Sequence, residues 1–135
     1  YPLSAMLFTL PGIPMIYSGQ EARLNKRLKF LEKDTIDWGT FSDENFYKKL
    51  ISLRKMHPVF WSNNANLEFL NGYTENVIGY RRWDDENTYH VILNLSNERE
   101  KLHNKISHEF LIRDKQSSDQ FISPNGFVVY KILNE

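Results

Sequence analysis

The chain opens with a helical apolar pattern that gives way to a strand-like one. Four apolar side chains recur at helical spacing: Leu3, Met6, Leu7 and Leu10. This spacing predicts a helix over residues 3–10, ended by Pro11 and Gly12. Residues 13–17 then form a short apolar run, which is typical of a strand buried on both faces. A helix that leads into such a strand indicates one step of a βα repeat.

A long polar segment separates this run from a second, clearer helix. Residues 18–41 show no sustained apolar period, so we expect a single long loop. Ser42 is a suitable N-cap, and an apolar stripe follows it at helical spacing. The stripe consists of Phe46, Tyr47, Leu50, Ile51 and Leu53. Pro58 predicts the end of this helix near Met56 and His57.

Beyond the polar stretch at residues 62–66 the pattern changes to short alternating strands separated by turns. We expect strands at residues 67–70, 77–83, 89–95, 110–113 and 127–133. Their spacing is typical of an antiparallel β-sandwich. The predicted fold is therefore mainly β: a C-terminal sandwich of Greek-key type, preceded by the final β/α elements of a (β/α)8 barrel. The corresponding domains are residues 1–65 and 66–135.

Charge and composition narrow the classes of function. Lys and Arg number 17, as do Asp and Glu, so no net field attracts nucleic acid or an anionic membrane surface. Residues 5–17 are apolar but too short, and too interrupted by Pro and Gly, to span a bilayer. The absence of Cys excludes disulfides and thiolate metal sites and leaves the cellular compartment open.

One motif identifies a family. Gly12, Pro14, Gly19 and Glu21 occupy the fixed positions of a Gly-x-Pro, four residues, Gly-x-Glu pattern. This segment resembles the eighth-strand motif of the α-amylase family of glycoside hydrolases. Three further segments, in the same order as in that family, resemble the closing loop, the last barrel helix and the first sandwich hairpin: residues 36–38, residues 46–58, and residues 77–82 with 91–96.

The resemblance implies a retaining enzyme that acts on α-glucans, by hydrolysis or transfer. Its chemistry needs two carboxyl groups about 5 Å apart. By resemblance, the catalytic acids belong to segments upstream of Tyr1, so we assign no catalytic residue in this chain. The acids at positions 34, 37, 84 and 85 lie in charged loops and turns, and we interpret them as solvated. We therefore expect the chain alone to be inactive.

Active sites of βα barrels are built from the loops after the strands, so the motif leads to the substrate cleft. By this argument Tyr17, Gln20 and Glu21 border the cleft of the complete enzyme, which we call the parent enzyme. Two interpretations of Glu21 stay open, and we favour the first: a buried acid that fixes the loop, or a direct contact with the sugar.

Other candidate sites are weaker. Trp61, Tyr73 and Trp83 could form a sugar-stacking platform, although core packing is the favoured interpretation. The four His residues are scattered over different elements, so we predict no metal site. We expect no cofactor in this chain; the resemblance allows calcium in the parent enzyme, since some family members bind it elsewhere in the barrel.

The predicted role is structural: a sandwich that stabilises the barrel of the parent enzyme. Its partners would be the rest of the catalytic barrel and, through the parent enzyme, an α-glucan, but no nucleic acid or membrane. The alternatives are a carbohydrate-binding module and a protein-interaction domain that self-associates. A lone eighth strand leaves edges unpaired, so we expect residues 1–40 to be mobile or packed against another chain and residues 42–135 to form the stable unit.

Overall fold

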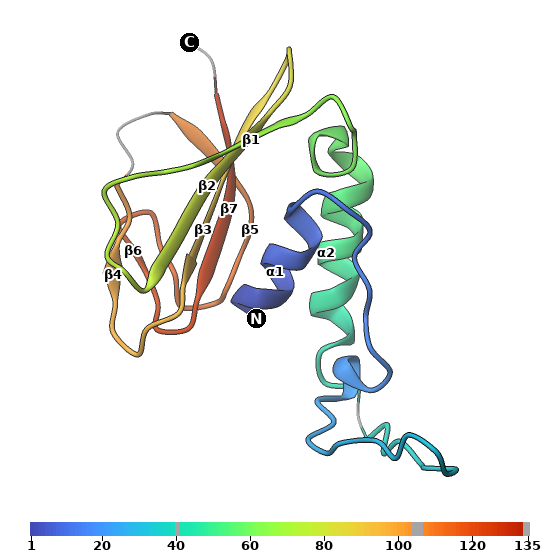
Figure 1. Cartoon of the computed structure of the whole chain (residues 1–135). Helices are drawn as coiled ribbons and strands as arrows, with labels where there is room; N and C mark the ends of the chain where they lie inside the picture. The colour runs from blue at the N-terminus through green and yellow to red at the C-terminus, as the bar shows by residue number, and fades with distance from the viewer. Residues whose placement is uncertain (40, 104–106, 134–135) are drawn as a thin grey trace.

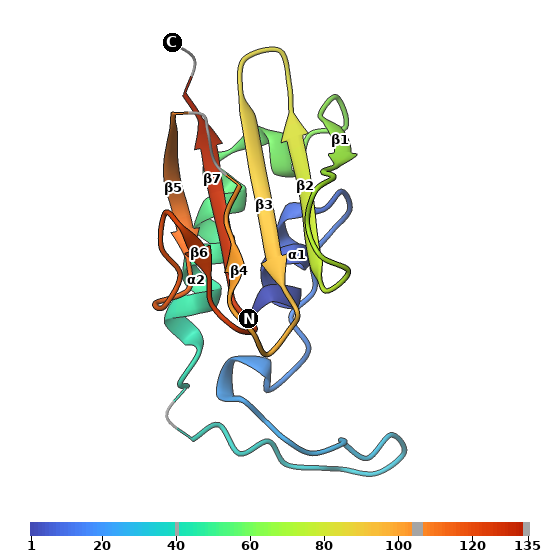
Figure 2. The ribbon, with the colours of Figure 1, turned by 90° about the vertical axis from the view of Figure 1, so that its left-hand side faces the viewer.

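The fold has three layers (Figure 1). A computed structural model describes residues 1–39, 41–103 and 107–133. Two helices, α1 (Pro2–Thr9) and α2 (Glu44–Met56), cover one face of a five-stranded sheet. A two-stranded sheet covers part of the other face (Figure 2). Neither helix of the described chain has the length and hydrophobicity needed to cross a membrane.

The large sheet is antiparallel throughout and has the order β1-β2-β3-β7-β5. Its strands are β1 (Asn66–Phe69), β2 (Val77–Trp83), β3 (Thr88–Asn94), β5 (His108–Arg113) and β7 (Phe127–Ile132). The small sheet pairs β4 (Glu100–Lys101) with β6 (Phe121–Ile122). The chain leaves the large sheet twice, for β4 and for β6, before β7 inserts between β3 and β5. The predicted mainly β, antiparallel sandwich class is confirmed.

Alternation along the strands builds a core on each face of the large sheet. One hydrophobic cluster faces the helices and includes Tyr89, Val91 and Leu93 of β3 together with Phe8 and Leu50 from the helices. The other cluster faces the small sheet and contains Val77, Ile92, Leu102, Ile122, Val128 and Tyr130. The central strands β3 and β7 are therefore buried on both faces.

Two local predictions are wrong, and two short strands were not predicted. Residues 13–17 form no strand, because no segment of the described chain lies beside them to complete a hydrogen-bonded ladder. Asp43, and not Ser42, is the N-cap residue of α2. The two-residue strands β4 and β6 were not expected, since a run that short carries no alternation.

The N-terminal helix belongs to the core. Ala5, Phe8 and Thr9 of α1 are buried and contact β3 and α2. The expectation that residues 1–40 lie outside the stable unit is therefore wrong for α1. Residues 13–17 differ, because Ile13 is 96% exposed and Met15 is 68% exposed. Residues 104–106 and 134–135 of the predicted second domain lie outside the described residues.

A buried arginine ties the helical layer to the sheet. Arg82 of β2 is fully buried and donates to three backbone carbonyl groups. Nε donates to Asn66 O at 3.0 Å, Nη1 to Thr9 O at 3.0 Å, and Nη2 to Val59 O at 2.7 Å. These acceptors belong to β1, to the end of α1 and to the 3-10 helix η2 (Pro58–Phe60). One side chain thus joins β2 to three segments that lie 16, 23 and 73 residues away in the sequence.

We expect Arg82→Met to lower the free energy of unfolding by about 3 kcal/mol, because each buried carbonyl left without a donor costs about 1–3 kcal/mol. Urea denaturation of the two proteins measures the difference. Arg81→Met is the matched control: Arg81 points to the opposite face, pairs with Glu68 and has a 43% exposed side chain. This control should cost less than about 1 kcal/mol. Equal losses in the two variants would contradict the assigned role.

Candidate functional site

The family-like motif begins with a turn that α2 holds in place. Gly12 has a φ of +111°, a conformation that favours glycine. Arg54 of α2 donates through Nη1 to Phe8 O at 2.9 Å and Leu10 O at 3.2 Å, and through Nη2 to Gly12 O. The guanidinium group therefore satisfies carbonyls at the end of α1 and in the turn together.

From this turn, residues 13–17 run along α2 toward its N-terminus (Figure 1). Between them and α2 lies an open, mainly apolar hollow of about 590 Å³. Its lining residues are Phe8, Pro14, Ile16, Ile51, Arg54, Lys55 and Trp61. Pro14 and Ile16 thus face the hollow, whereas Ile13, Met15 and Tyr17 are exposed.

The segment then enters a tight turn at Gly19, which has a φ of +93°. A side chain at Gly19 would begin 2.9 Å from Leu24 Cβ, so glycine is required sterically as well. Gln20 Oε1 accepts a hydrogen bond from Tyr17 N at 2.6 Å and closes the turn. Gln20 and Glu21 continue into the 3-10 helix η1 (Gln20–Ala22). We call residues 17–21 the motif loop.

The backbone of Glu21, at the end of the motif loop, is bonded to the start of α2. Its carbonyl oxygen accepts a hydrogen bond from Asp43 N at 3.0 Å. Its carboxylate oxygen Oε2 is buried and has no hydrogen-bond partner among the described residues. Buried carboxylate oxygens normally have a donor, so this atom marks a place where one is missing.

Asp43 anchors the end of the motif loop. Its carboxylate accepts hydrogen bonds from Arg23 Nε and Nη2, both at 2.7 Å, and from the Tyr1 hydroxyl at 2.7 Å. The Asp43 side chain is only 11% exposed, whereas that of Arg23 is 58% exposed. Asp43 therefore holds the loop both through its backbone N–H and through a two-pronged ion pair.

The chain is similar to known proteins, although no family model matches it. It is 35% identical over 96 residues to a pullulanase of Bacillus subtilis, covering 60% of this chain and 13% of that protein. It is 31% identical over 99 residues to the α-amylase MalA of Haloarcula japonica, covering 68% and 14%. The crystal structure of an α-amylase from H. orenii matches 98% of this chain and 35% of that one, at a TM-score of 0.70 and 21% identity. The chain belongs to the α-amylase family.

This α-amylase family chain corresponds to the C-terminal part predicted from its motif. It spans about one-seventh of the length of the two curated relatives. The trehalulose synthase MutB from Pseudomonas mesoacidophila also shares the fold, with a TM-score of 0.55 at 22% identity, over 66% of this chain and 17% of that one.

The three candidate stacking residues do not form one surface. Trp61 lines the hollow beside α2. Tyr73 packs against the cluster that faces the small sheet, on the other side of the large sheet. Strand alternation directs Trp83 away from the helices, and the Arg81 guanidinium lies 4.6 Å from its ring centroid. Trp61 and Tyr73 therefore contact different layers of the α-amylase family fold.

The histidines are accounted for by packing. Nδ1 of His57 lies 3.1 Å from the Tyr89 hydroxyl, and Nδ1 of His90 lies 3.1 Å from the Tyr130 hydroxyl. Burial, with smaller contributions from Arg81 and His108, lowers the pKa of His90 to about 4, so the ring is neutral at pH 7. The described residues contain no cluster of acids and histidines able to hold a metal ion.

Two of the loop acids stabilise turns. Asp34 accepts hydrogen bonds from the Lys26 side chain and from the backbone N–H groups of Lys29 and Thr35, which lower its pKa to about 2. Asp84 accepts from Glu86 N and Asn87 N at 3.1 and 2.8 Å. These contacts are local turn contacts of the kind that Asp forms throughout loops.

Two features of the site were not predicted from the sequence. The contacts of Asp43 join residues separated by 20 and 42 positions, which no short motif encodes. Trp38 and Phe41 form a stacked ring pair on the long loop, with centroids 5.5 Å apart. Trp38 belongs to segment 36–38, which resembles the closing loop of the family, but its stacking with Phe41 was not predicted.

We expect Asp43→Asn to loosen the loop between η1 and α2, since the amide loses the charge of the ion pair with Arg23. Trypsin should cut the Lys- and Arg-rich residues 23–33 about fivefold faster, which corresponds to about 1 kcal/mol of local opening. Glu44→Gln is the control, because it removes only the exposed pair with Lys48. Equal cleavage rates for the two variants would refute the anchoring role.

Proposed function

We propose that this chain forms the closing end of the catalytic barrel, and the sheet domain after it, in a retaining enzyme that acts on α-glucans. Its own role is structural, and it has no activity alone. The observation that carries this proposal is the path of the motif: Arg54 holds its start, and Asp43 holds its end at the N-terminus of α2. The names of the relatives, a pullulanase and an α-amylase, support the choice of α-glucan as substrate.

The path of the motif supports a position at the catalytic face. In a βα barrel, the loop from the end of a strand to the start of the next helix lies at the face that carries the active site. The motif loop would be such a connection if residues 13–17 complete a strand in the parent enzyme, since Glu21 O is bonded to Asp43 N, at the N-cap of α2. Tyr17, Gln20 and Glu21 would thus border the substrate cleft.

The structural role rests on the shared core. Phe8 of α1 and Leu50 and Leu53 of α2 pack with Tyr89 and Leu93 of the sheet in one hydrophobic cluster. The sheet therefore fixes both helices, and the helices fix the ends of the motif through Arg54 and Asp43. In the parent enzyme this arrangement would hold one side of the cleft without contributing to bond cleavage.

The purified chain should release no reducing sugar from soluble starch, whereas the parent enzyme should do so under the same conditions. The physical reason is that retaining cleavage needs two carboxyl groups about 5 Å apart, and the carboxylates of Asp34 and Asp84 are engaged in turns. A reducing-sugar assay at equal molar concentration makes the comparison. Sugar release by the chain alone would overturn the proposal.

Glu21→Gln separates the two interpretations of the unpaired carboxylate. In the chain alone the substitution should be neutral or stabilise by up to about 1 kcal/mol, because the carboxylate oxygen Oε2 is buried and has no donor among the described residues. In the parent enzyme it should lower thermal stability, because there a donor outside this chain would bind Oε2. Loss of activity with unchanged thermal stability would instead assign Glu21 to sugar binding, and Glu32→Gln, on the exposed loop, serves as the control.

A further inference from the structure

The long loop after the motif carries an exposed pair of stacked aromatic rings, formed by Trp38 and Phe41. Their centroids are 5.5 Å apart and their planes differ by only 17°. Ring pairs of the core, such as Phe46 with Phe127 at 63°, cross steeply instead. Trp38 is 39% exposed, Phe41 is 43% exposed, and neither belongs to a hydrophobic cluster of the fold. The pair therefore presents apolar ring surface to solvent.

The backbone fixes this pair to the start of α2. Phe41 N donates to Trp38 O at 3.1 Å, and Glu44 N donates to Phe41 O at 3.0 Å. Gly39 N donates to Asp37 Oδ1 at 3.0 Å. Phe41 has a φ of +49°, a left-handed conformation that is unfavourable for a bulky side chain. Such a conformation persists where surrounding contacts impose it, and it is concentrated at functional sites.

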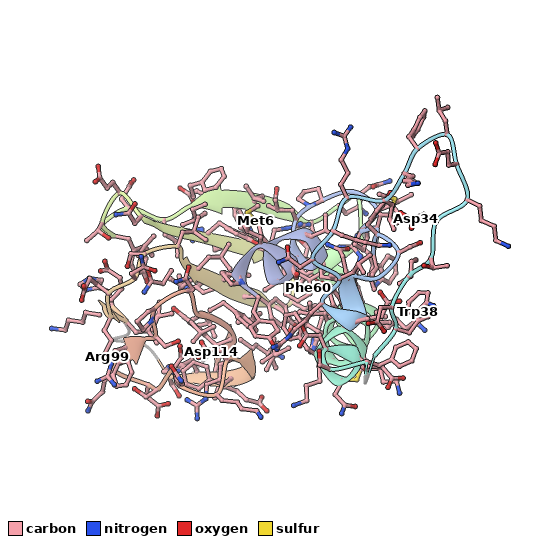
Figure 3. The ribbon with its side chains drawn as sticks, turned by 90° about the horizontal axis from the view of Figure 1, so that it is seen from below. Met6, Asp34, Trp38, Phe60, Arg99 and Asp114 are labelled. Carbon is pink, nitrogen blue, oxygen red and sulfur yellow. The ribbon has the colours of Figure 1, made fainter. Side chains whose placement is uncertain are left out.

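The pair lies next to the motif loop. Ile36 packs against Gly19, since a side chain built there would begin 3.3 Å from Ile36 Cγ2. Trp38 follows two residues later, and Figure 3 shows it on the segment that returns toward α2. The rings thus flank the residues that the proposed function puts at the edge of the cleft.

We propose that Trp38 and Phe41 bind a pyranose ring of the α-glucan chain at the edge of the cleft, remote from the cleaved bond. A pyranose has an apolar face of C–H groups that packs against a flat aromatic ring. Phe41 stacks on one side of the indole, and Trp38 is still 39% exposed, which leaves ring surface for the sugar. The inference rests on the proposed function for its location and adds a subsite that would favour long chains.

Kinetics of the parent enzyme with short and long substrates test the subsite. Trp38→Ala should raise KM for maltoheptaose about tenfold and leave kcat unchanged, the pattern for loss of uniform binding. KM for maltotriose, too short to reach the pair, should stay constant. Trp38→Phe, which keeps an aromatic face, should restore most of the affinity. Trp83→Phe is the control, since the Trp83 ring packs against Arg81.

Two outcomes would overturn the inference: an unchanged KM for maltoheptaose, or a fall in kcat for both substrates, which would mean that the pair only positions the loop.

Tryptophan fluorescence of the chain titrated with maltoheptaose gives a second readout that needs no catalysis. Quenching should saturate and should vanish in Trp38→Ala, whereas loss in Trp61→Ala instead would refute the assignment. A parent enzyme without activity on any α-glucan would defeat the proposed function, and the titration would still decide on the pair.

Discussion

The three hydrogen bonds of Arg82 are the constraint on which the rest of the arrangement depends. The guanidinium group is buried and forms no ion pair with a carboxylate in the part of the chain that the structure describes; it donates to carbonyl groups of three different segments: Thr9, Val59 and Asn66. Burial lowers the pKa of Arg82, but an arginine retains its proton even so. A buried positive charge that is bound by carbonyl groups tolerates little displacement, because each lost hydrogen bond leaves a buried donor and a buried acceptor without a partner.

The contacts of Arg82 also help to fix the position of the candidate site. Thr9 is the last residue of α1, so fixing its carbonyl fixes the helix end, where the unsatisfied carbonyls carry partial negative charge. Arg54 then binds the next carbonyls, at Leu10 and Gly12, and sets the direction in which the motif departs. Asp43 binds the far end of the motif, through the hydrogen bond from its N–H group to Glu21 O. The position of the motif loop thus depends on Arg82 of the sheet and on Arg54 and Asp43 of the α2 region.

Periodicity was sufficient for the elements and insufficient for the site. The strand β2 was predicted with its observed bounds, and both helices were found to within two residues. Alternation within β2 also puts Arg82 on the face that packs against the helices, because Ile78 and Tyr80 of the same face belong to the helix-facing cluster. What alternation cannot state is the identity of the acceptors. These are carbonyls of segments up to 73 residues away, and only the folded chain brings them together.

Residues 13–17 have the sequence pattern of a strand that the structure does not form. Their strand was predicted and is absent, yet the alternation is present: Pro14 and Ile16 face the hollow beside α2, while Ile13, Met15 and Tyr17 face solvent. A segment with two apolar faces, of which this chain covers part of one, fits a barrel strand whose ladder partners lie in other segments of the proposed parent enzyme. The same argument applies to Glu21 Oε2, a buried acceptor four residues beyond Tyr17. In the proposed parent enzyme a further segment would cover the exposed side chains of Ile13, Met15 and Tyr17 and would supply a donor near Glu21, since the described residues offer none to Oε2.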